Sequence, residues 1–260
     1  LFKEKKKIYS IAQLPPPPDE KLKPNGKYYA LLIGNSNYSD KGKFKDLASP
    51  KNDVIKLSKL LETKYKFKVI TAIDIKRDEF FDKIDELKNL VTPNDYVLIY
   101  YSGHGEKRGN NEIYWIPVNA SKNSKRDWVN VDDITVDFEG DAPELPSYHL
   151  ALLVDSCWFS VKGSSIVKNK NISYQKLLNK RAAIIMASGQ DEFVDEPGEG
   201  NSSFGHTIIT ELENANKPIR LHDIFKQVEI ELGDLDQTPL YRGMKKWNHS
   251  VGDFIFIPVS

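Results

Sequence analysis

Short apolar runs alternate along this chain with segments whose apolar residues recur at helical spacing. Five such runs are typical of buried strands: residues 28–34, 67–72, 96–101, 150–154 and 182–187. Helical patterns cover about 52–62, 78–90, 204–214 and 219–232, and Asn52 or Asp53 is the predicted N-cap of the first. This alternation predicts an α/β fold with a mainly parallel sheet and helices on both of its faces. A last strand is predicted over residues 253–258, at an edge of the sheet.

Two of these runs end in residues that can carry chemistry. Ser102-Gly103-His104-Gly105 follows one run, and Asp155-Ser156-Cys157, with the only cysteine, follows another. Because ligands bind outside the carboxyl ends of parallel strands, His104 and Cys157 are predicted to meet at the same sheet edge. A lone cysteine is often an inert core residue and a lone histidine is often structural. Together at two strand ends, however, they favour a thiol nucleophile with an imidazole base.

This pair predicts a distinct chemical role for each of the two residues. His104 would take the thiol proton of Cys157 and later donate a proton to a leaving amine. The backbone N–H groups of Gly105 and Cys157 are the candidates for the oxyanion hole that a tetrahedral intermediate needs.

The motifs resemble those of the caspase-like cysteine peptidases of family C14, in particular metacaspases, paracaspases and their bacterial relatives. The resemblance covers about residues 28–257 and rests on five blocks: residues 30–38, 52–53, 100–105, 115–118 and 155–157. It implies a three-layer sandwich with a six-stranded, mostly parallel sheet. It also implies that His104 and Cys157 form a catalytic dyad.

The resemblance further implies an acidic pocket for the residue before the cleaved bond, the P1 residue. Asp53 and Asp155 match two pocket acids of paracaspase-like sites, and Asp195 or Glu196 matches a third. Carboxylates would bind the guanidinium of Arg or the ammonium of Lys through charge-assisted hydrogen bonds and would reject Asp. The open alternative is that Asp53 only caps its helix and Asp155 only orients a loop.

Composition limits the remaining possibilities. Residues 1–27 hold seven lysines, three acids and a run of four prolines, which predicts a tail or linker before a single peptidase domain at 28–260. The remainder has 30 basic and 34 acidic residues, which predicts a basic peptide substrate and no nucleic acid. One cysteine excludes an internal disulfide and suits the cytoplasm, and no apolar run is long enough for a membrane helix. The absence of an initiator Met predicts an excised or processed piece of a longer protein, with a possible fused or associated sensor module.

Three further questions stay open in the sequence. The basic loop within residues 162–181 could be a site of self-cleavage or simply a solvated loop. No cofactor or metal is predicted, although the acids of residues 191–199 leave calcium activation as a minor alternative. The competing functions are a catalytically silent caspase-fold interaction module and, more weakly, a flavodoxin-like nucleotide binder.

Overall fold

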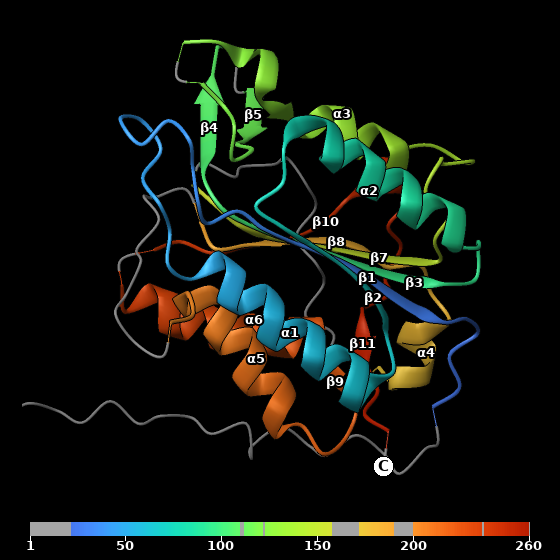
Figure 1. The fold of residues 1–260 in the computed structure, drawn as a ribbon. Coiled ribbons are helices and arrows are strands. Elements are labelled where there is room, and N and C mark those ends of the chain that lie inside the picture. The colour runs from blue at the N-terminus through green and yellow to red at the C-terminus, as the bar shows by residue number, and fades with distance from the viewer. Residues whose placement is uncertain are drawn as a thin grey trace, which may run out of the picture.

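A six-stranded sheet forms the centre of the molecule, in the strand order β10-β8-β7-β3-β1-β2 (Figure 1). The computed structural model describes residues 22–109, 112–121, 123–157, 172–189, 200–235 and 237–259. All neighbouring strands of this sheet are parallel except β10, which runs antiparallel to β8. The strands are β1 (Tyr28–Gly34), β2 (Lys68–Ile73), β3 (Tyr96–Ser102), β7 (His149–Asp155), β8 (Ala183–Ala187) and β10 (Leu240–Gly243). The predicted six-stranded, mostly parallel α/β sheet is therefore confirmed.

Two small sheets accompany the central one. One contains β4 (Gly105–Arg108), β5 (Glu112–Trp115) and β6 (Val129–Asn130), and the other pairs β9 (Ile219–Arg220) with β11 (Ile255–Phe256). β4 begins at Gly105, directly after His104, so the chain passes from His104 straight into the three-stranded sheet.

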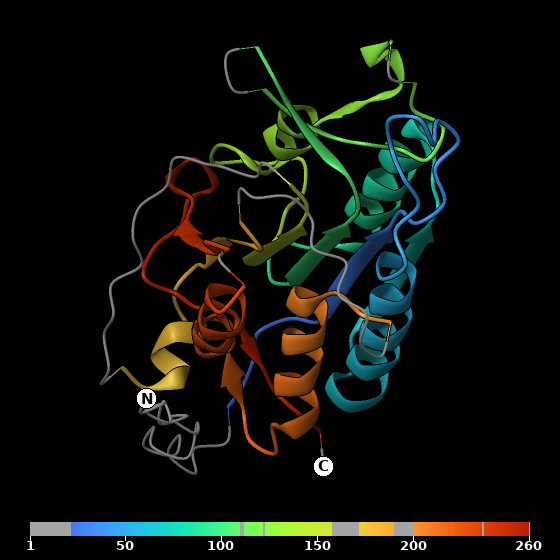
Figure 2. The same cartoon turned by 90° about the vertical axis from the view of Figure 1, so that its left-hand side faces the viewer.

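Helices cover both faces of the central sheet, as Figures 1 and 2 show. One face packs against α1 (Pro50–Tyr65), α4 (Tyr174–Leu178), α5 (Ser203–Asn214) and α6 (Leu221–Gly233). The other face packs against α2 (Arg77–Leu90) and α3 (Val131–Thr135). Strand β3 shows why both faces must be covered, since all seven of its residues are buried. Alternate residues of β3 belong to the two cores, with Tyr100 on the α1 face and Tyr101 on the α2 face.

The start of α1 differs from the prediction that Asn52 or Asp53 caps it. The helix begins at Pro50 with Ser49 at the N-cap, so Asp53 lies in the first turn. Proline has a fixed φ and no N–H, both of which suit the first position of a helix. The side chain of Asp53 is thus available for contacts outside its own helix.

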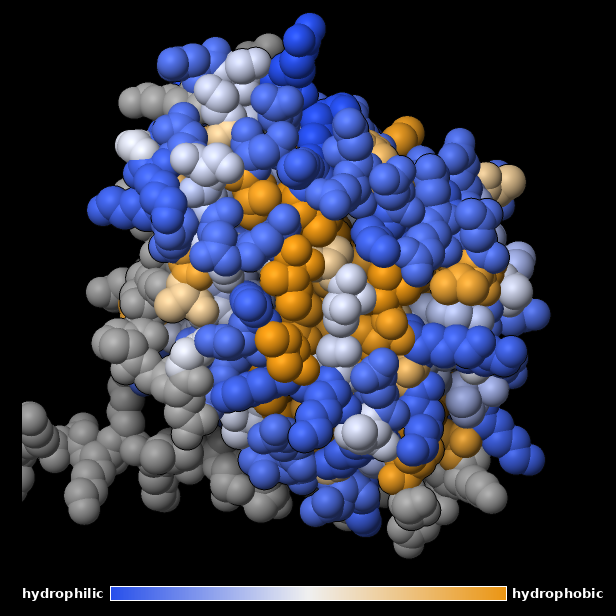
Figure 3. All heavy atoms as spheres, viewed as in Figure 1, coloured by the Kyte–Doolittle hydropathy of each residue, from blue (hydrophilic) through white to orange (hydrophobic). Residues whose placement is uncertain are grey.

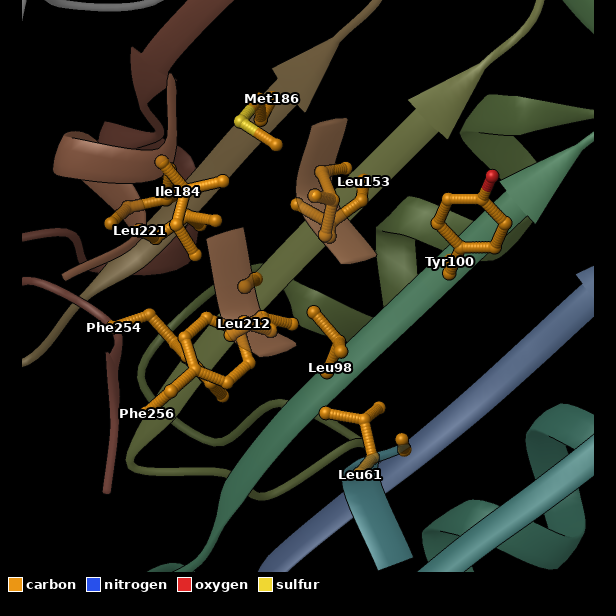
Figure 4. Packing of buried hydrophobic residues seen from close by; sticks show 14 of the residues in the cluster. Leu61, Leu98, Tyr100, Leu153, Ile184, Met186, Leu212, Leu221, Phe254 and Phe256 are labelled. Carbon is orange, nitrogen blue, oxygen red and sulfur yellow. The ribbon is translucent and has the colours of Figure 1, made fainter. Parts of the chain in front are cut away.

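The prediction that residues 253–258 form an edge strand of the central sheet is wrong. The edge is β10, while Ile255 and Phe256 pair with β9 in the two-stranded sheet. Phe254, Ile255 and Phe256 are fully buried, and Figure 4 shows Phe254 and Phe256 among the core side chains of the α1 face. The apolar run was a signal for core packing, whereas the four-residue β10 lacks a comparable apolar run.

Strand β2 forms the opposite edge and pairs with β1. Figure 3 shows apolar side chains at the surface of the molecular face that carries this edge. Val69, Ile70 and Ile73 of β2 are only partly buried. The catalytic candidates lie elsewhere, after the carboxyl ends of β3 and β7 in the middle of the sheet.

Candidate active site

Strand register brings the turns that carry His104 and Cys157 together. Ser102 at the end of β3 pairs with Asp155 at the end of the adjacent, parallel β7. His104 and Cys157 each lie two residues beyond this pair. The N–H of Gly103 also donates to the carbonyl oxygen of Asp155 at 3.2 Å. The two turns therefore lie side by side, at the same level beyond the carboxyl ends of β3 and β7.

The two turns also approach each other closely at Gly105. A Cβ atom at this position would lie 2.5 Å from the carbonyl oxygen of Cys157 and 3.0 Å from Oγ of Ser156. Real Cβ atoms do not come so near to backbone. The absence of a side chain at Gly105 is thus what lets the histidine turn lie against the cysteine turn.

The imidazole of His104 is held by the loop between β1 and α1. Its Nε2 lies 2.8 Å from the carbonyl oxygen of Lys45, and its ring lies against Tyr38 and Phe44, with centroids 4.7 and 5.7 Å away. Because a carbonyl only accepts hydrogen bonds, Nε2 carries the proton in this contact and Nδ1 of the neutral ring is an acceptor. Burial lowers the pKa of His104, an effect that the Lys45 carbonyl and the charge of Glu106 oppose.

Asp53 is fully buried and connects α1 to the start of α5. Its carboxylate accepts hydrogen bonds from Nδ2 of Asn201 at 2.6 Å, from Oγ and N of Ser202 at 2.8 and 3.3 Å, and from the hydroxyl of Tyr100 at 3.2 Å. Asp53 is thus bound by Ser202, the N-cap of α5, and by Asn201, the residue before it. The alternative that Asp53 merely caps its own helix is wrong.

Asp155 lies close enough to Asp53 to perturb its ionisation. Burial, followed by the negative charge of Asp155, raises the pKa of Asp53 to about 7, although its hydrogen bonds oppose the shift. Asp155 is 3% exposed, and strand alternation puts it on the same face as Leu153, which belongs to the core under α1 and α5. Two buried carboxyl groups therefore lie near each other, and one of them, Asp155, comes two residues before Cys157.

Comparison with known proteins assigns the chain to a family. The sequence profile described as the caspase domain, of peptidase family C14, matches residues 27–246. The chain belongs to the caspase-domain family. The crystal structure of caspase-1 from Spodoptera frugiperda agrees in fold, with a TM-score of 0.61 over 86% of this chain and 90% of that one, at 16% identity.

Two mammalian proteins match a shorter stretch of this caspase-domain chain at higher sequence identity. Mucosa-associated lymphoid tissue lymphoma translocation protein 1 from Homo sapiens is 38% identical over 91 residues, which is 35% of this chain and 10% of that protein. Its homolog from Mus musculus is 37% identical over the same length. This chain thus spans about a tenth of the length of these relatives.

Several predicted features of the caspase-domain chain lie outside the described residues. These are the third pocket acid, Asp195 or Glu196, the basic loop at 162–170 and the acidic stretch at 191–199. Within the described ranges, His, Cys, Asp and Glu side chains form no group of three or more that could hold a metal ion. Nor does any helix of the described part of the chain have the length and apolarity to cross a membrane.

The sequence patterns did not single out the residues that hold the predicted site residues in place. Lys45 contacts His104 through its backbone carbonyl, so its side-chain identity carries no signal. Asn201 and Ser202 bind Asp53, and a signal for them did exist, because Ser202 is a typical N-cap residue two positions before the predicted helix 204–214.

Proposed function

We propose that this chain is a cysteine endopeptidase that hydrolyses peptide bonds after Arg or Lys. The observation that carries the proposal is the matched position of His104 and Cys157, two residues beyond a register pair of adjacent parallel strands. The close approach of the chain at Gly105 to the backbone of Cys157 supports it, since it leaves no room for a side chain between the two turns. Membership of the caspase-domain family supports the same chemistry.

In the proposed reaction, Nδ1 of His104 takes the proton from Sγ of Cys157, and the thiolate attacks the carbonyl carbon of the scissile bond. The Lys45 carbonyl favours this role because it holds the ring proton on Nε2. The N–H groups of Gly105 and Cys157 are proposed to bind the oxyanion. Nδ1–H then donates its proton to the leaving amine as the C–N bond breaks. Water, deprotonated by Nδ1, hydrolyses the thioester and restores the thiol.

The proposed P1 pocket rests on Asp53 and Asp155. A cationic side chain would offset the negative charge of two carboxyl groups that are buried near each other. An acidic side chain would add further negative charge to the same buried site, so Asp at P1 is expected to be rejected. Asp195 or Glu196 remains the proposed third acid.

The proposed context is a cytoplasmic effector module of a larger regulated protein, without cofactor and without a nucleic-acid or membrane partner. The small fraction of its mammalian relatives that the chain covers supports a modular origin. A protein or peptide with a basic P1 residue is the proposed partner.

Matched fluorogenic peptides that end in Arg, Lys or Asp test the proposal, with wild-type protein and Cys157→Ala. Cleavage after Arg and Lys that the variant lacks is expected. Cleavage after Asp would retain the nucleophile and overturn the acidic pocket. If the folded protein cleaves none of them and Cys157 does not react with iodoacetamide, the non-catalytic interaction module becomes the better reading.

A further inference from the structure

Two tyrosine hydroxyls form hydrogen bonds with the backbone of His104. Tyr38 follows β1 and is 2% exposed, while Tyr101 lies near the end of β3 and is fully buried. The N–H of His104 donates to Oη of Tyr38 at 2.9 Å. The hydroxyl of Tyr101 donates to the carbonyl oxygen of His104 at 2.7 Å. Both polar backbone groups of this one residue are therefore held by phenols.

The surroundings keep these phenols in place. The ring of Tyr101 stacks on Trp115 at 4.3 Å and 15°, and the N–H of Ile116 donates to Oη of Tyr101 at 3.2 Å and to the His104 carbonyl at 3.1 Å. The ring of Tyr38 lies against the imidazole itself. The hydroxyls are thus fixed from both β5 and the loop after β1.

Gly103 reveals how closely the turn fits the two hydroxyls. A Cβ atom at this position would lie 2.9 Å from Oη of Tyr101 and 2.9 Å from Oη of Tyr38, and its φ of +155° is one that side-chain-bearing residues rarely adopt. The hydroxyls occupy the space that a side chain at 103 would need. The turn that leads into His104 is therefore packed directly against the two phenols.

We propose that Tyr38 and Tyr101 are positioning residues for His104, which hold its peptide so that the imidazole reaches the Lys45 carbonyl and faces Cys157. The inference rests on the proposed function, and neither tyrosine is assigned a contact with substrate. A displacement of about 1 Å in such a group costs on the order of 100-fold in rate, so hydrogen bonds to its backbone matter to turnover. Burial raises the pKa of both phenols well above its ordinary value, so both remain protonated at any pH of assay.

Tyr38→Phe and Tyr101→Phe test this inference, because each removes a hydroxyl and keeps the ring. Tyr114→Phe is the matched control, since its hydroxyl binds the side chain of Glu112 on the same small sheet. We expect each of the two variants to lose about 10-fold in kcat, with KM for an Arg peptide unchanged, as follows from one lost hydrogen bond. The double variant should lose little more than the single ones because the hydroxyls act on one residue. The control should match wild type.

Alkylation of Cys157 by iodoacetamide gives a second readout that needs no turnover. The pH dependence of this rate reports the imidazole beside the thiol, and His104→Ala defines the profile without it. Each phenylalanine variant should move the wild-type profile toward that of His104→Ala. Unchanged alkylation profiles and unchanged kcat would overturn the positioning role, even if the thermal midpoint falls. If wild-type protein cleaves no peptide, the proposed function fails, and the alkylation profiles alone then decide the positioning role.

Discussion

The proposed acidic pocket predicts that recognition of a basic P1 residue weakens as the pH falls through 7. Burial and the charge of Asp155 raise the pKa of Asp53 to about 7, so in the free protein its protonated form predominates below that pH. A cationic P1 side chain binds the ionised form. Below pH 7, therefore, binding must first remove a proton from Asp53, and the affinity is reduced by that cost.

The size of the effect follows from the same value. Asp53 is about half ionised at pH 7 and about one-tenth ionised at pH 6, and each further pH unit costs about 1.4 kcal/mol. We expect kcat/KM for an Arg peptide to fall up to about tenfold per pH unit below 7, mainly through KM. His104 does not produce this fall near pH 7, because burial lowers its pKa and it remains neutral there. The raised pKa of Asp53 also makes its contribution to folding largest at low pH, and this contribution is lost as the pH rises through 7.

Steady-state kinetics between pH 5 and 8 test this reasoning with wild type, Asp53→Asn and the exposed control Asp132→Asn. The rise in KM below pH 7 should disappear in Asp53→Asn, whose KM should already be high at pH 8. The control should follow wild type. An equal rise in KM in Asp53→Asn would refute the assignment of the proton to Asp53.

The remaining predictions concern single contacts. Gly105→Ala should abolish turnover, since its Cβ would lie 2.5 Å from the Cys157 carbonyl oxygen. As a control, Gly233→Ala should retain wild-type kinetics, because its Cβ would meet nothing within 4 Å. Equal turnover rates for the two variants would contradict the close approach at Gly105. Asn201→Ala removes a 2.6 Å donor to Asp53, so the KM for Arg peptides should rise about threefold to tenfold with kcat unchanged, and a fall in kcat alone would argue against this. Phe254→Ala should lower the free energy of unfolding in urea by about 3–5 kcal/mol, while a loss below about 1 kcal/mol would instead fit an edge position. Calcium chelation should leave turnover unchanged, and a rate that recovers only with added calcium would show a metal requirement.

The sequence was most informative about the interior of the sheet. The runs before His104 and Cys157 are apolar throughout, and a strand buried on both faces requires this. It was misleading at the periphery, where the apolar run at Phe254–Phe256 is a core segment and the actual edge strand β10 carries Arg242 and Gly243. Periodicity reports burial, and burial alone does not tell an edge strand from a covered segment.

Within the candidate site, the sequence pointed to the candidate residues whose side chains are proposed to act and missed those that hold them. His104 and Asp53 stand out by type and place, but the contact of Lys45 is made by its carbonyl. The hydrogen bond of Asn201 to Asp53 spans 148 positions in the chain, so only the folded structure reveals it. Supporting contacts of this kind depend on three-dimensional proximity that no local pattern encodes.

Covalent trapping of the nucleophile tests the central claim most directly. Wild-type protein, Cys157→Ser and Asp155→Asn would each be treated with matched peptide chloromethyl ketones that end in Arg or Asp, and the adducts would be located by mass spectrometry of peptide digests. We expect rapid addition of the Arg reagent to Cys157, slow addition of the Asp reagent, no adduct at residue 157 in Cys157→Ser, and a reduced preference for Arg in Asp155→Asn. Equal rates for the two reagents in wild type, or no adduct at Cys157 in folded protein, would contradict it.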